Sequence, residues 1–292
     1  MFFDKKEKTR SVYAVYNILA SSLYKISGLL SNFIIRTVFI YSLGKEYLGV
    51  NSVFTSVLNV LSLAELGIGT AIVFYLYKPI ANNDNERIKS LILFYKRIYF
   101  LIGCLVFLLG LLLIPFLNAI VKLDTSFPEN IYLIYIFYLM NSALSYMLFA
   151  YLQSFLSACQ KQYVVNNYNF IFTIINTVAC CIVLIAFKNY YLFLLIRIGM
   201  TLVTNFTIRN VTYKLYPFLK EKNSKMISRD TRNNIFKNVV SIFIFRISST
   251  LSDTVDTIII SGVLGTVTAG IYANYEMLYT SILGIVNMFF YS

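Results

Sequence analysis

Eight long apolar stretches follow one another along this 292-residue chain, and they constrain its fold more than any other feature. A helix needs about 20 mainly apolar residues to cross the hydrocarbon core of a bilayer. Stretches of that length lie at about 13–42, 48–77, 95–117, 131–157, 168–187, 190–212, 236–263 and 270–292. The sequence therefore predicts an all-α polytopic membrane protein with about eight transmembrane helices.

The composition favours the same class. Hydrophobic residues make up 58% of the chain and charged residues 13%, whereas an average soluble domain is about 45–50% apolar and about 25% charged. So few charges leave too little polar material to cover a soluble globule of this size. The sequence has no histidine, and its four cysteines lie in or beside apolar stretches without metal-ligand spacing. We therefore expect neither disulfides nor a metal site.

The basic residues predict how the helices are oriented. If the N-terminus is cytoplasmic, 18 of the 25 Lys and Arg residues fall in cytoplasmic segments, and the outer loops hold only Lys45, Lys122 and Lys188. Cytoplasmic loops of membrane proteins are enriched in Lys and Arg. The distribution predicts a multi-pass plasma-membrane protein with a cytoplasmic N-terminus. Anionic membrane lipids are sufficient partners for the net charge of +12, and no nucleic acid is expected.

An internal repeat divides the chain. A shift of 221 residues aligns YKISGLLSN (24–32) with FRISSTLSD (245–253), and LGKEYLGV (43–50) with LGTVTAGI (264–271), without gaps. Six predicted helices separate the copies, so both copies cross the membrane in the same direction. The repeat predicts a complete six-helix lobe (1–213), a basic cytoplasmic linker (214–234) and the first two helices of a second lobe (235–292).

Cations inside the predicted helices are candidate site residues, because a charge at the bilayer centre costs about 2.5–3.5 kcal/mol and normally faces a cavity or a partner. Lys25 and Arg36 are eleven residues apart and share one helical face. The repeat aligns Lys25 with Arg246, so these two are expected to face each other across a central cleft and bind an anionic group such as phosphate. Arg197 lies within another predicted helix. Arg36 has no basic counterpart, and reaching the outer interface is its alternative role.

Acidic and amide side chains also occur inside the predicted helices. The acids Glu65, Asp253 and Asp256 can form ion pairs that hold helices together, Lys25 with Glu65 for example. Amides in membrane helices are typical of hydrogen bonds between helices. Those of this kind are Asn141, Gln153, Asn169 and Asn205.

Three motifs follow one another within residues 42–81: an LG-x-E-x-x-G turn (43–49), AELGIGTA (64–71) and LYKP (76–79). Together they resemble the Wzx-type polysaccharide flippases. This family belongs to the MOP superfamily, which also holds the MATE multidrug exporters and the lipid II flippase. The polar helix start before the third predicted span and the basic linker after the sixth fit the same family.

The resemblance implies two six-helix lobes around a cation-lined cavity that opens alternately to either side of a bacterial plasma (inner) membrane. The substrate would be a polyprenyl-diphosphate-linked oligosaccharide for capsule, exopolysaccharide or O-antigen synthesis. Other polysaccharide-assembly proteins would be partners, and the protein would be no enzyme. No cofactor is implied beyond a proton or sodium gradient.

Site roles follow from the same resemblance. The diphosphate is expected to bind Lys25 and Arg246, with Arg197 and Arg36 as secondary contacts. The acids expected to couple transport to an ion are Glu65, Asp253 and Asp256.

Three other interpretations stay open beside this one. A MATE-like multidrug or cation antiporter is the nearest, although its cationic substrates favour an acidic cavity and the first predicted helix offers only cations. A membrane enzyme would be expected to carry acid–base residues on a long outer loop, and the longest, about 118–130, holds only Asp124 and Glu129. Because Wzx-type proteins usually have twelve or more helices, the third interpretation is a truncated, non-functional fragment.

Overall fold

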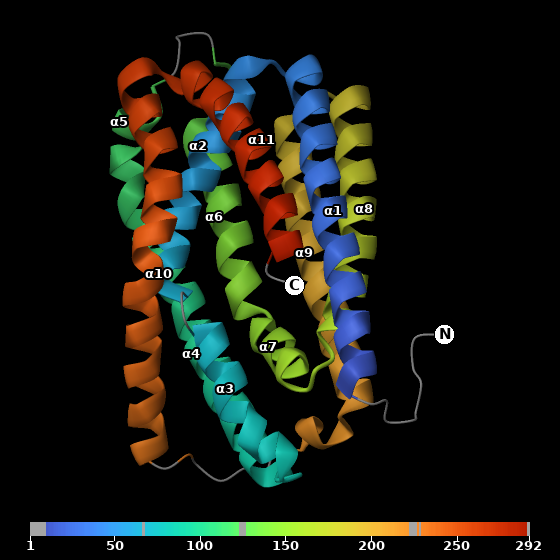
Figure 1. Ribbon diagram of the computed structural model, residues 1–292. Coiled ribbons are helices and arrows are strands. Elements are labelled where there is room, and N and C mark those ends of the chain that lie inside the picture. Colours follow the sequence, from blue (N-terminus) through green and yellow to red (C-terminus); the bar gives the residue numbers. More distant parts are fainter. Residues whose placement is uncertain (1–9, 66–67, 123–126, 222–226, 228, 291–292) are drawn as a thin grey trace.

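A computed structural model describes residues 10–65, 68–122, 127–221, 227 and 229–290, but not the side chains of 10–11, 63–64, 230, 241, 243–254 and 284–290. Within these ranges the regular structure is entirely helical (Figure 1). The helices are α1 (Arg10–Ser42), α2 (Lys45–Leu61), η1 (Ser62–Glu65), α3 (Ile68–Ala81), α4 (Asn85–Leu113), η2 (Ile114–Phe116), α5 (Leu117–Ile120), α6 (Ile131–Met147), α7 (Ala150–Ala158), α8 (Gln162–Ala186), α9 (Tyr190–Leu215), η3 (Pro217–Lys220), α10 (Arg229–Leu264) and α11 (Thr266–Phe290).

Each of the eight predicted stretches falls on helix, but two of them are broken. The 48–77 stretch divides into α2, η1 and α3, and the 131–157 stretch divides into α6 and α7, whose axes differ by 42°. The second bend lies at Leu148, which is extended, and Phe149, which has a φ of 63°. Sharp helix kinks usually coincide with Pro or Gly. Neither residue type stands at 148–149, so no residue there predicts this bend.

Four helices in the described part of the chain are long and apolar enough to cross a membrane, at Val12–Ser42, Asn85–Ile120, Gln162–Ala186 and Tyr190–Leu215. The bent pair α6 and α7 makes a fifth if it is one span. The chain is therefore an all-helical protein compatible with a membrane, with four to five candidate spans where eight were expected. Two of the missing spans fall partly on side chains outside the described set, and the third is broken by η1.

The helices run between two ends of an elongated bundle (Figure 1). The α1–α2, α8–α9 and α10–α11 connections lie at one end, which we call the hairpin end. The opposite end holds the start of α1 and the α3–α4 and α7–α8 connections. Along the bundle α1 packs on α8, and α2 packs on α10 and α11.

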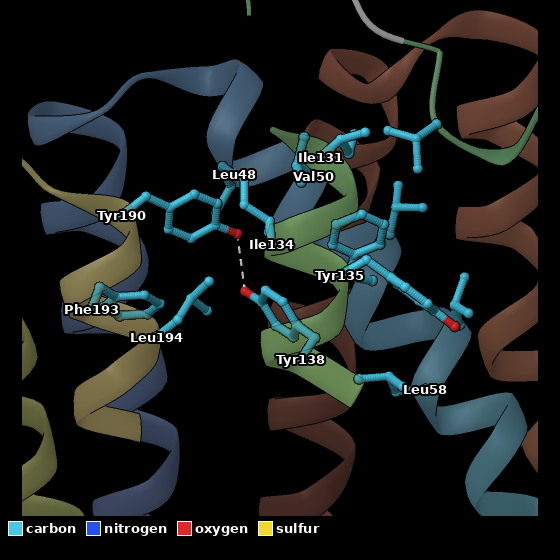
Figure 2. Packing of buried hydrophobic residues seen from close by; sticks show 14 of the residues in the cluster. Leu48, Val50, Leu58, Ile131, Ile134, Tyr135, Tyr138, Tyr190, Phe193 and Leu194 are labelled. Carbon is cyan, nitrogen blue, oxygen red and sulfur yellow. Dashed lines mark hydrogen bonds between the residues drawn. The ribbon is translucent and has the colours of Figure 1, made fainter. Parts of the chain in front are cut away.

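The core near the hairpin end contains buried aromatic residues among a larger number of aliphatic ones. Figure 2 shows Tyr135, Tyr138, Tyr190 and Phe193 among aliphatic side chains, and Phe54 is buried in the same cluster. The Tyr138 and Tyr190 hydroxyls lie 3.1 Å apart and share a hydrogen bond, and Tyr135 donates to the carbonyl oxygen of Gly110 at 2.9 Å. The buried tyrosine rings pack between helices and their hydroxyl groups form hydrogen bonds, so both kinds of contact hold neighbouring helices together.

The α1–α2 and α10–α11 turns have the same backbone geometry. Gly44 and Gly265, which the 221-residue shift aligns, have φ values of 104° and 93°. Only glycine adopts this region readily. Five residues further on, the aligned Gly49 and Gly270 bring α2 and α11 into backbone contact. A Cβ atom on Gly270 would lie 2.9 Å from the Cα of Gly49, and one on Gly49 would overlap the carbonyl oxygen of Thr266.

Candidate functional site

A cavity of about 790 Å³ lies among α1, α2, α6, α7, α8, α9 and α11. Its volume is within the range of about 300–1,000 Å³ that ligand pockets occupy. Eight Asn or Gln side chains and ten Ser or Thr side chains line it, with only three charged residues, Arg36, Arg197 and Glu276. The cavity is therefore polar but nearly uncharged, with a formal surplus of one positive charge.

Arg36 ties three helices together at the wall of this cavity. Its Nη1 donates to the carbonyl oxygen of Ala273 at 2.6 Å and to Oδ1 of Asn274 at 2.9 Å, both on α11. Its Nη2 donates to Oγ of Ser52 on α2 at 3.0 Å. The 221-residue shift aligns Ser52 with Ala273, so one guanidinium bridges equivalent positions in the two copies. Its side chain points into the bundle, toward α2 and α11.

Arg197 on α9 is held by aromatic rings. Its guanidinium carbon lies 5.9 Å from the ring centre of Tyr138 and 5.7 Å from that of Phe193, within the range of cation–π attraction. The Tyr138 hydroxyl bonds in turn to Asn51 and Tyr190. Glu276 on α11 lines the same cavity, and its carboxylate interacts electrostatically with the Arg36 guanidinium. The two arginines and Glu276 thus leave the cavity wall with one more positive than negative formal charge.

Lys25 occupies a different place from Arg36. It is exposed on α1, it does not line the cavity, and it makes no hydrogen bond or ion pair with the described residues. The Lys25–Glu65 ion pair considered from the sequence does not form. Glu65 ends η1 and accepts a hydrogen bond from the Tyr99 hydroxyl at 3.2 Å, outside the cavity lining.

The remaining predicted site residues belong to α10. The side chains of Arg246 and Asp253 lie outside the described set, so their expected roles stay predictions. Asp256 is exposed and accepts a hydrogen bond from the Tyr272 hydroxyl at 3.0 Å. It does not line the cavity. The structure therefore brings together Arg36 and Arg197 from the predicted set.

Three of the four amides singled out in the sequence bond between helices as predicted. Thr201 on α9 donates to Asn141 on α6 at 2.8 Å, and Gln153 on α7 donates to Asn205 on α9 at 3.4 Å. Asn169 has no hydrogen bond to the described residues and faces the cavity.

Sequence reasoning missed that these amides converge on a single cavity. A signal was present, since polar residues recur every three or four positions along α8, which places them on one helical face. They are Asn166, Asn169, Thr173, Asn176 and Thr177.

Among the described residues no group of His, Cys, Asp and Glu is arranged to hold a metal ion. No model of a known protein family, no curated protein and no solved structure matches the chain. The cavity itself must therefore carry any functional conclusion.

Proposed function

We propose that the protein is a transporter that moves a polyprenyl-diphosphate-linked oligosaccharide across a bacterial plasma membrane by alternating access. The observation that carries this proposal is the composition of the cavity wall. Two arginines and a single acidic residue, Glu276, lie in a lining that is otherwise uncharged and rich in amide and hydroxyl side chains. Such a wall suits a ligand that joins an anionic group to uncharged polar groups.

The charge of the wall favours an anionic over a cationic substrate. Arginine presents a planar fork of donors that matches phosphate oxygens, and it keeps its charge in an apolar environment. Glu276 is the single acidic lining residue against Arg36 and Arg197. A MATE-like exporter of cations would instead need carboxylates to outnumber arginines at its binding site.

The α2–α11 contact supports alternating access. Gly49 and Gly270 bring the two helices together near the hairpin end, and Arg36 adds hydrogen bonds to both helices. In the proposed mechanism residues 1–213 form one lobe and residues 235–292 begin a second, related by an axis along the membrane normal. Separation of α2 from α11 would then open the cavity toward the hairpin end, which we place outside the cell.

The proposal is tested by ligand binding to the purified chain in lipid nanodiscs. A polyprenyl diphosphate carrying a neutral disaccharide should bind, and Arg197→Ala should weaken its binding about ten- to hundredfold, because charge-assisted hydrogen bonds contribute about 1.5–3 kcal/mol. Arg97→Ala is the matched control, since Arg97 is exposed and does not line the cavity. Equal affinity of the Arg197→Ala and unmodified proteins, or preferential binding of organic cations, would contradict the proposal.

A further inference from the structure

The amides of the cavity wall keep unused hydrogen-bonding groups. Asn51, Asn141, Asn176 and Asn205 each accept a hydrogen bond at the side-chain oxygen, from Tyr138, Thr201, Cys180 and Gln153 respectively. Their amino groups have no acceptor in the described part of the chain. The hydrogen bonds at their oxygens thus orient these four amides, and their amino groups remain available to a ligand in the cavity.

Three further amides are wholly unused. Asn32 on α1, Asn59 on α2 and Asn169 on α8 line the cavity, and their side chains form no hydrogen bond with the residues that the structure describes. We call the region lined by Asn32, Asn59, Asn141, Gln153, Asn169 and Asn205 the amide chamber. It draws on six helices, and none of its members carries a charge.

The amide chamber extends away from the arginines. Arg197 and Asn205 are eight residues apart on α9, which corresponds to about 12 Å along the helix axis. Arg197 is nearer the hairpin end, where α9 begins at Tyr190. A ligand with its phosphates at the arginines would therefore place its adjoining groups among the amides.

A wall of this kind matches sugar hydroxyls. Each amide side chain can both donate and accept hydrogen bonds, as each sugar hydroxyl can. An apolar ligand would leave the amides unpaired and lose their hydration, and a second anion would meet no counter-charge among them. We propose that the amide chamber binds an uncharged saccharide while the diphosphate occupies Arg36 and Arg197. This inference rests on the proposed function and adds the chemistry of the glycan and the residues that select it.

Two variants test the chamber without breaking a hydrogen bond within the described protein. Asn169→Leu and Asn32→Leu each replace an amide by an apolar group of similar size, on different helices. The affinity of each variant, in lipid nanodiscs, is measured for two probes. One is a bare polyprenyl diphosphate, and the other is the same lipid carrying a neutral disaccharide. We expect each variant to bind the glycosylated lipid about five- to twentyfold more weakly, with the bare lipid changed less than about twofold. Asn82→Leu, at an exposed position outside the cavity, should change neither.

The outcomes separate this inference from the proposed function. If the unmodified protein binds both lipids equally, or if the variants weaken both equally, the amide chamber selects no sugar and the inference is overturned. A third probe carrying an acidic sugar overturns it if that probe binds more tightly than the neutral one. If Arg197→Ala weakens both lipids while the amide variants change nothing, the proposed function stands and the chamber fails. If neither lipid binds to the unmodified protein, both the inference and the proposed function are overturned.

Discussion

At the scale of single residues, the hydrogen bonds of Arg36 distinguish it from the other cation on α1. Its guanidinium reaches three acceptors on α2 and α11, whereas Lys25 is exposed and makes no hydrogen bond to the described residues. The two cations lie on one helical face, and the repeat gives only Lys25 a basic counterpart, Arg246. The two residues differ in their surroundings, since Arg36 faces α2 and α11 whereas Lys25 is exposed.

Exchange of the two cation types at these positions should expose the difference. Arg36→Lys keeps the charge but replaces a planar fork by a single ammonium group, which cannot span acceptors on two helices. We expect the free energy of unfolding, measured in mixed detergent micelles, to fall by about 1.5–3 kcal/mol. The reciprocal Lys25→Arg should change it by less than about 0.5 kcal/mol. A larger effect at Lys25 than at Arg36 would show that the hydrogen bonds of Arg36 do not stabilise the bundle.

At the scale of helices, hydropathy predicted where helices occur and failed to predict where they break. Spanning stretches stand out because about 20 consecutive apolar residues are rare elsewhere. The α6–α7 bend depends on how Phe149 is accommodated by its neighbours, including Phe206 and the Arg209 guanidinium carbon, 4.9 Å from its ring centre. Such tertiary contacts leave no periodic trace in the sequence. The repeat, in contrast, identified the glycines of both turns and of the α2–α11 contact.

The α2–α11 contact should fail when a methyl group is added to it. Gly49→Ala places a Cβ atom against the backbone of Thr266, so the helices must separate, and such overpacking costs about 1–3 kcal/mol. Spin labels at exposed Lys45 and Thr268 should move apart in this variant, as measured by pulsed electron resonance. Gly199→Ala is the matched control because its Cβ would meet nothing within 4 Å. That change should stabilise α9 by about 0.5–1 kcal/mol and leave the label distance unaltered.

At the scale of the whole molecule, the cavity is assembled from seven helices, and this limits what the sequence could reveal about it. That Arg36 and Arg197 line a cavity could be expected, because a charge in an apolar helix normally faces a partner or a cavity. The same could not be expected of Asn32 and Asn59, since an isolated amide in a helix is equally suited to a hydrogen bond between helices. Which amides remain unpaired depends on the packing of α1, α2 and α8 around the cavity.

The orientation of the whole bundle is the last prediction. Single cysteines replace Lys45, at the hairpin end, or Lys78, near the opposite end, in a protein whose four native cysteines are changed to alanine; both lysines are exposed. Since basic residues gather in the segments of the opposite end, the positive-inside rule places that end in the cytoplasm. A membrane-impermeant maleimide should therefore label the Lys45→Cys protein in intact cells, and the Lys78→Cys protein only after the membrane is opened. The reverse labelling result would show that the hairpin end faces the cytoplasm. The α2–α11 contact would then close the cytoplasmic side of the cavity.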